Sequence, residues 1–479
     1  MEEILESAPE KRRFINVFLL ALLNLSVMSS LRNLPLVSEY GYGSLFFYCL
    51  VAFVFLFPAA LISAELATGW VKTGGIYIWV REAFGPMWGF FAVWMQWIHN
   101  VTWFPAILAF SATTLTYLFN PELAENKLYI ISSILIGFWG ITFYNSLGLK
   151  FSSWFSALGV ISGTILPGFL IIGLGIAWAS GNNPMQIQFS YEALIPKMDD
   201  IRNIVFLTGL FLAFGGLEVS AVHAREVQNP QKNFPRAILI AALLCFFVYT
   251  LGALAIAFVI PASDLSLVSG LMDAFEILLS KYNLQYLIGP VAVMIVYGAI
   301  GELNAWIIGP VRALHATSKH GDLPPIFQKL NKHGMPMNLL IFQGFIVTIT
   351  SFVFLFMPSS SSAFWILSAM SIQIYLVMYV LMFLAAIKLR YSHPHIERPY
   401  RIPYHMHGIW FIGSLGTISS LFAFAIGFVP PSQLPTGNIF FYEGFLILGN
   451  LIVSLIPILI YLYKKESWHP GHEARTPSP

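Results

Sequence analysis

Long apolar stretches separated by short polar segments follow one another along the whole chain. Twelve of these stretches are long enough to form a helix that crosses a bilayer, which takes about 20 residues. They lie at residues 14–38, 43–66, 86–118, 128–147, 153–179, 204–223, 235–260, 287–314, 337–357, 363–389, 408–429 and 441–463. The hydrophilic segments between them are short loops, the longest near residues 181–203, 316–336 and 390–407. The pattern predicts an all-α membrane protein with twelve transmembrane helices, here numbered spans 1 to 12.

Basic residues in the loops indicate the orientation of the chain. An even number of spans places both termini on one side of the membrane. If that side is the cytoplasm, twenty Lys and Arg residues fall on cytoplasmic segments, and only Lys127, Lys197, Arg202 and Lys281 fall on the opposite loops. Cytoplasmic loops of membrane proteins carry such an excess of positive charge. We therefore expect both termini in the cytoplasm, and the acidic N-terminus without a small-residue cleavage site predicts that span 1 is permanent.

Two spans are interrupted near their middles. Span 1 contains the polar run from Ser29 to Asn33, and span 6 contains Gly215 and Gly216 followed by a carboxylate. Glycine costs about 1 kcal/mol relative to alanine in a helix, so a glycine pair favours unwinding. The two interruptions are five spans apart, as expected for two inverted five-helix repeats, spans 1–5 and spans 6–10.

This pattern gives the domain organisation. We expect a cytoplasmic N-terminal tail at residues 1–13, an inverted-repeat transport core at residues 14–390, a cytoplasmic loop with spans 11 and 12 at residues 391–463, and a short disordered cytoplasmic tail at residues 464–479.

Paired interruptions in corresponding spans of two repeats are typical of the binding site of a transporter. An unwound stretch frees amides from one half-helix and carbonyls from the other, and together these groups bind a carboxylate and an ammonium. An α-amino acid carries both. The alternative interpretation of each interruption is a kink that serves helix packing.

Three further runs carry a family resemblance. They are residues 74–85 (GGIYIWVREAFG), residues 229–237 (NPQKNFPRA) after Gly216–Glu218, and residues 301–312 (GELNAWIIGPVR). As a set they resemble the amino acid/polyamine/organocation transporters, and the run in span 8 looks most like the bacterial glutamate/γ-aminobutyrate antiporters. The resemblance extends from about Phe14 to Tyr463.

The resemblance implies a substrate site and an activity. It places the unwound part of helix 1 at Met28, Ser29 and Ser30, the break in span 6 at Gly215 and Gly216, and the wall of the permeation path at Trp306, Tyr375 and Tyr379. It implies exchange of extracellular glutamate for intracellular γ-aminobutyrate by alternating access, favoured at acidic pH, in the plasma membrane of a bacterium. The alternatives are a proton-coupled importer of a neutral or cationic amino acid and, from another class, an ion channel.

Three charged side chains lie within spans, namely Arg32, Glu218 and Glu302. Charges at such positions are costly, so each is a functional candidate. We expect Arg32 to lie near a second charge of the substrate or to gate the outer side, and Glu218 and Glu302 to act in proton coupling or gating. The structural alternative is an ion pair that fastens spans 1 and 6. Arg32 is a departure from the related antiporters, which carry an aromatic residue there.

Composition excludes several other classes of protein. Apolar residues make up 57% of the chain and charged residues 10%, against roughly 45–50% and about 25% in soluble domains. A net charge of +2 gives no basic surface for nucleic acid. The two cysteines, Cys49 and Cys245, lie in separate apolar runs, and the five aspartates lie in loops, so thiol, zinc and aspartyl enzymes lack their residues. We expect no cofactor or metal, and we expect amino acids and the lipid bilayer as partners, with no prediction of the oligomeric state.

Overall fold

The computed structural model describes residues 15–28, 30–70, 74–148, 158–159, 161–196, 198–219 and 227–469. Throughout these ranges the regular elements are helices, and one isolated parallel bridge joins Ile15 to Val227. Ten helices in them are long and apolar enough to cross a membrane. The prediction of an all-α membrane protein is therefore confirmed at this level.

These ten helices correspond to ten of the predicted spans. They are α3 (Gly43–Val51), continued through the π-turn η2 (Ala52–Leu56) into α4 (Phe57–Gly69); α7 (Lys127–Ser146); η4 (Ile161–Ile165) with α9 (Leu166–Ser180); η6 (Ile201–Ile204) with α10 (Leu207–Ala213); α11 (Pro230–Val259); η9 (Gln285–Leu287) with α13 (Ile288–Thr317) and η10 (Ser318–His320); α15 (Met337–Ser351) with α16 (Val353–Phe356); α17 (Ser360–Ser392); α18 (His405–Ile426); and α19 (Ile439–Leu462).

Spans 1 and 3 are not among these ten apolar helices, span 1 because its helix is broken and span 3 because its helix contains polar residues. Span 1 is divided into α1 (Val17–Met28), the turn η1 (Leu31–Asn33) and α2 (Leu34–Ser38), with Ser30 in an extended conformation at φ −126° and ψ 117°. Span 3 is the continuous helix α6 (Pro86–Thr116), which has 31 residues and is buried along most of its length. Its polar run around His99 and Asn100 lowers its hydropathy, and these polar residues lie inside the protein.

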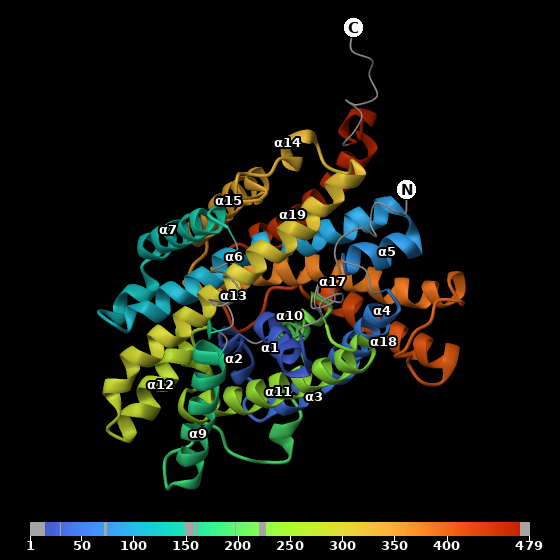
Figure 1. The fold of residues 1–479 in the computed structure, drawn as a ribbon. Coiled ribbons are helices and arrows are strands. Elements are labelled where there is room, and N and C mark those ends of the chain that lie inside the picture. The colour runs from blue at the N-terminus through green and yellow to red at the C-terminus, as the bar shows by residue number, and fades with distance from the viewer. Residues whose placement is uncertain are drawn as a thin grey trace.

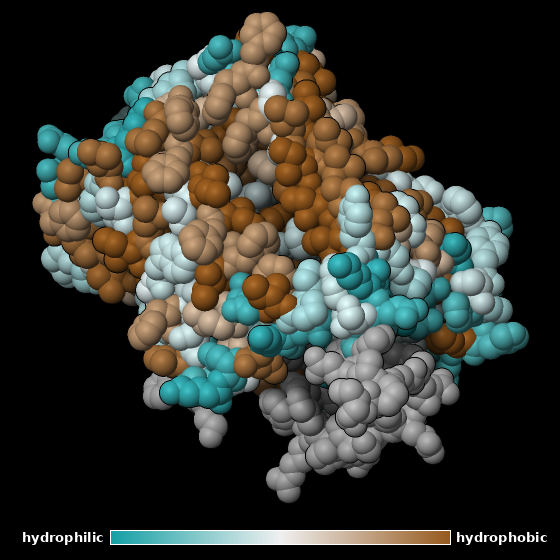
Figure 2. Space-filling model, turned by 90° about the horizontal axis from the view of Figure 1, so that it is seen from above, coloured by the Kyte–Doolittle hydropathy of each residue, from teal (hydrophilic) through white to brown (hydrophobic). Residues whose placement is uncertain are grey.

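Three long helices form the centre of the molecule. α6 packs against both α13 and α17, which lie side by side with it in Figure 1. α18 and α19 lie outside this centre. In the most apolar stretch of α19 only 22% of the residues are buried inside the protein. Large apolar side chains such as Phe440 and Leu448 are exposed there. Figure 2 shows apolar side chains over much of the surface, as expected where lipid replaces water.

Short helices occupy the loops at the two ends of the bundle. α14 (Pro325–Gln328) and α12 (Gly270–Lys281) lie at opposite ends in Figure 1, as their predicted cytoplasmic and outer positions require. α5 (Ile76–Phe84) follows the end of α4.

The segment that follows α19 is held against the α13–α14 loop. The Lys464 ammonium donates to Asp322 Oδ1 and to the His320 carbonyl, each at 2.7 Å, and Gln328 Nε2 donates to the Trp468 carbonyl at 2.8 Å. Residues 464–469 thus differ from the disorder expected from Lys464 onward. The remainder of the expected tail, residues 470–479, lies outside the described residues.

A buried carboxylate fastens the loop between α17 and α18 to α4. Glu65, 1% exposed, accepts two hydrogen bonds from Arg390 at 2.7 and 2.6 Å and one from the Ile402 amide at 2.8 Å. Arg398 Nε lies 3.6 Å from the same carboxylate and its guanidinium stacks over Trp70. A bidentate pair with further hydrogen bonds is the arrangement in which a buried ion pair is tolerated.

Glu65→Gln should therefore destabilise the protein by about 3 kcal/mol, because it leaves the buried Arg390 without a counter-charge. The measurement is unfolding of the purified protein in detergent. Arg202→Gln is the control, because the Arg202–Asp200 ion pair is exposed, and this variant should unfold as the wild type does. Equal stability of both variants would contradict a structural role for Glu65.

Candidate functional site

The break in span 1 is closed by a tyrosine from another helix. The Tyr249 hydroxyl, on α11, donates to the Met28 carbonyl and accepts the Ser30 amide at 2.8 Å. A buried backbone group without a partner is costly, and the membrane interior offers no water to supply one. Tyr249 therefore supplies the hydrogen bonds that the helix loses at the break. Ser29 lies outside the described residues.

The break in span 6 has the same kind of closure. α10 ends at Ala213, and the Gly216 amide then donates to the Tyr379 hydroxyl, on α17, at 2.9 Å. Gly216 has φ +111°, a conformation that side chains rarely adopt, and a Cβ here would lie 3.2 Å from the Val27 carbonyl. Glycine thus permits both the turn and the close approach of the two breaks.

Glu218 directly follows this break and is saturated with donors. It is 1% exposed and accepts from Tyr375 and Tyr379, each at 2.6 Å, and from Gln96 Nε2 at 3.1 Å. Charge-assisted bonds of this kind are stronger than neutral ones. Glu218 therefore joins span 6 to α6 and α17 in this conformation.

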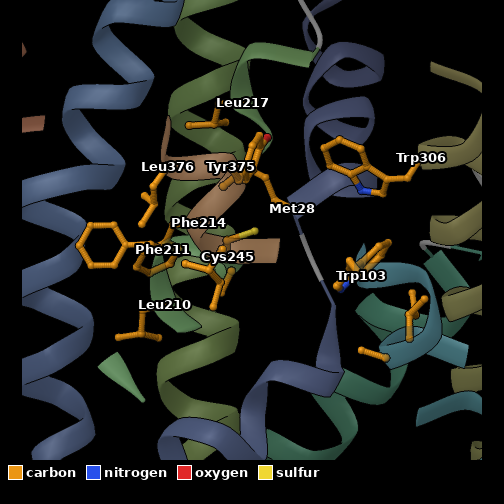
Figure 3. Packing of buried hydrophobic residues seen from close by; sticks show 14 of the residues in the cluster. Met28, Trp103, Leu210, Phe211, Phe214, Leu217, Cys245, Trp306, Tyr375 and Leu376 are labelled. Carbon is orange, nitrogen blue, oxygen red and sulfur yellow. The ribbon is translucent and has the colours of Figure 1, made fainter. Parts of the chain in front are cut away.

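A small cavity lies between the two breaks. Its volume is about 20 Å³, room for about one water molecule. Six of the residues predicted from the sequence line it, namely Met28, Arg32, Gly215, Glu302, Trp306 and Tyr375. Figure 3 shows Trp306 and Trp103 on one side, facing Met28 and Tyr375. The predicted residues Ser30, Gly216, Glu218 and Tyr379 are joined to the breaks by the hydrogen bonds described above.

Arg32 and Glu302 bring opposite charges to this cavity. They interact electrostatically, and Glu302 also forms a side-chain hydrogen bond with Ser30. Within the described residues, no ion pair closer than 4.0 Å joins Arg32 to Glu218 or to Glu302. The Arg32 guanidinium instead lies over the Trp103 ring, 4.5 Å from its centroid. The alternative of a direct ion pair fastening spans 1 and 6 is absent from this conformation.

Sequence reasoning did not find the wall that α6 contributes. His99, Asn100 and Trp103 line the cavity, and the His99 ring stacks on Tyr375 with centroids 3.8 Å apart. Tyr249 was missed as well. The polar run in the middle of span 3 could have indicated the α6 residues. Nothing in the sequence distinguishes Tyr249 from the other tyrosines among the 20 in the chain.

A second cavity, of about 590 Å³, lies between loops on the side predicted to be outside. Its wall comes from residues 39–42, from the loop before α10 and from Ser432 and Gln433 after α18. Burial raises the pKa of Glu39 in this wall from 4.5 to about 8.

A membrane protein whose centre is built around two broken helices has the architecture of a secondary transporter. An amino acid permease family model matches residues 15–452. The chain therefore belongs to the amino acid permeases of the amino acid/polyamine/organocation superfamily, a family of transporters and not of enzymes. The predicted resemblance is confirmed, and the family implies amino-acid-like substrates.

Three relatives within the family are similar to this chain over most of their sequences. An uncharacterized transporter of Legionella pneumophila is 42% identical, over 94% of this chain and 96% of its own. A glutamate/γ-aminobutyrate antiporter of Lactococcus lactis is 31% identical, over 95% of this chain and 92% of its own. A probable agmatine/putrescine antiporter of the same species is 25% identical, over 76% and 77%.

Tyr249→Phe should lower the free energy of unfolding by about 2 kcal/mol, because it leaves a buried carbonyl and a buried amide unpaired. Tyr48→Phe is the matched control. The Tyr48 hydroxyl is also buried and has no hydrogen-bond partner in the described residues, so its removal should cost nothing. Unfolding in detergent measures both variants, and an equal effect would show that the hydroxyl of Tyr249 does not support the break.

Glu39→Gln should change how stability depends on pH. A carboxyl with a folded-state pKa of about 8 and an unfolded value of 4.5 destabilises the folded state progressively as the pH rises between these values. The variant should therefore match the wild type at the acid end of this range and exceed its stability at the alkaline end. Thermal unfolding across the range measures this, with the exposed Glu192→Gln as control; a constant difference would contradict the assignment.

Proposed function

We propose that the protein is an amino acid antiporter that exchanges extracellular glutamate for intracellular γ-aminobutyrate by alternating access. The observation that carries this proposal is the cavity where the two broken helices meet, with Arg32 and Glu302 on its wall. A zwitterion presents one charge to each of these side chains. The names of the relatives at 31% identity supply the particular pair of substrates.

The proposed architecture has twelve spans, with spans 1–5 and 6–10 as inverted repeats and both termini in the cytoplasm of a bacterium. It counts the broken span 1 and the polar α6 together with the ten apolar helices. Equivalent breaks five spans apart support the repeat. The loops on the predicted cytoplasmic side include α14 and the segment from Lys464 to His469.

Transport by this site requires movement of the helices. A cavity of about 20 Å³ does not hold an amino acid, so the wall must open before a substrate enters. The hydrogen bonds of Tyr249 and Tyr379 cross between helices at the breaks. These bonds are therefore the contacts that opening at either break would change, and the ammonium and carboxylate groups of a substrate are chemically able to replace them.

Uptake of labelled glutamate into proteoliposomes tests the proposal. Uptake should require preloaded γ-aminobutyrate and should be faster at acidic than at neutral pH. Uptake into empty vesicles driven by a proton gradient would instead support the importer, and unitary currents in electrical recordings would support a channel. Exchange of agmatine for putrescine without glutamate uptake would reassign the substrate.

Glu218→Gln tests proton coupling at the same site. It should flatten the pH dependence of exchange, because the amide cannot take up the proton that the carboxylate takes up. The measurement is the exchange rate against pH in proteoliposomes containing equal amounts of folded protein. Glu276→Gln, on the exposed face of α12, is the control and should keep the wild-type profile. An unchanged profile in the Glu218 variant would remove this residue from the coupling mechanism.

A further inference from the structure

Arg32 combines nearly complete burial with unused hydrogen-bond donors. Its side chain is on the wall of the central cavity, and the residue is 3% exposed. Its Nε and Nη1 atoms are buried and have no hydrogen-bond partner in the described part of the chain. This differs from the other buried arginine described above, Arg390, which makes four hydrogen bonds.

The neighbouring indole also has a free donor. Trp103 Nε1 is buried and unpartnered within the described residues, and the Trp103 ring lies under the Arg32 guanidinium at 4.5 Å. Figure 3 shows this indole on the side of the site that faces Met28. The contact with the ring face is made by the guanidinium as a whole and leaves its Nε–H and Nη1–H groups available for a ligand.

The unused donors define the chemistry of the ligand. The Nε–H and Nη1–H groups lie on different edges of the guanidinium, so a carboxylate accepts from one of them and from the indole N–H beside it. The carboxylate of Glu218 already accepts from three side chains, so it does not compete for these donors. Glu302 remains as the anion on the same wall, suited to an ammonium group.

We propose that Arg32 and Trp103 form a carboxylate subsite that every transported substrate must fill. This inference rests on the proposed function, because it assigns a substrate group to the cavity of the exchanger. The subsite therefore determines which substrates bind. Amino acids that carry a carboxylate bind, whereas diamines of the same length are rejected, because one of their ammonium groups would face Arg32.

The subsite predicts that this chain rejects diamines even though it is similar to a relative named for agmatine and putrescine. The probable agmatine/putrescine antiporter is similar to this chain over 76% of its length, so the overall fold does not decide between amines and amino acids. A buried guanidinium does decide, because bringing a second cation beside it is unfavourable in a site removed from bulk water.

Equilibrium competition against labelled γ-aminobutyrate on the purified full-length protein tests the subsite without requiring transport. Glutamate should compete, whereas putrescine and butylamine, which keep an amine but lack a carboxylate, should not. Arg32→Gln should weaken γ-aminobutyrate binding by about a hundredfold and Trp103→Phe, which removes the indole N–H and leaves a smaller aromatic ring, by roughly tenfold. Arg32→Lys keeps the charge without the guanidinium N–H groups and should fall between these values.

Two features separate a loss of the subsite from a loss of the fold. Trp139→Phe is the control for replacing an indole by a phenyl ring, because Trp139 donates to Thr348 away from the cavity, and it should bind as the wild type does. In addition, Arg32→Gln should gain affinity for putrescine, measured by direct binding of the labelled diamine, which a misfolded protein cannot do.

The outcomes distinguish this inference from the proposed function. If glutamate and γ-aminobutyrate bind but Arg32→Gln and Trp103→Phe bind them as tightly as the wild type, the carboxylate subsite is wrong and the exchanger stands. Equal competition by putrescine and γ-aminobutyrate in the wild type would likewise overturn the subsite. If neither amino acid binds to the wild type, the proposed substrates and the subsite both fail.

Discussion

The need to pair every backbone amide and carbonyl inside the membrane governs the centre of this protein. An unbroken helix meets the need by itself, but spans 1 and 6 interrupt their helices away from bulk water. Tyr249 and Tyr379 restore the missing hydrogen bonds from neighbouring helices. The breaks are therefore stable only because α11 and α17 are packed against them, and the site depends on contacts between distant parts of the chain.

Buried charged side chains also need hydrogen-bond partners, and they differ in whether the protein supplies them. Glu65 is surrounded by two arginines and an amide, and Glu218 by two phenols and an amide side chain. Both carboxylates are thus satisfied by the protein itself and fix the arrangement of helices. Arg32 differs, because its Nε and Nη1 atoms have no hydrogen-bond partner within the described residues, and these buried free donors are the basis of the proposed carboxylate subsite.

The proposed exchange activity relates these features to one another. A cavity with room for about one water molecule keeps the path closed when no substrate holds the site open. A substrate whose carboxylate and ammonium replace internal partners offsets the cost of separating them, so opening becomes coupled to binding. A carrier built in this way moves solute only when the site is occupied, which is the property an antiporter needs.

The sequence by itself determined the helical membrane class, the family, the two interruptions and half of the residues that line the cavity, because apolar length, glycine pairs and charges within spans are local signals. It did not determine that Glu218 is saturated while Arg32 has free donors, since the partners Gln96, Tyr375 and Tyr379 come from other helices. Nor did it reveal the α6 wall or Tyr249. In a chain with 13 Trp and 20 Tyr, only tertiary packing decides which ring lies beside a broken helix, because that choice depends on how helices far apart in the sequence come together.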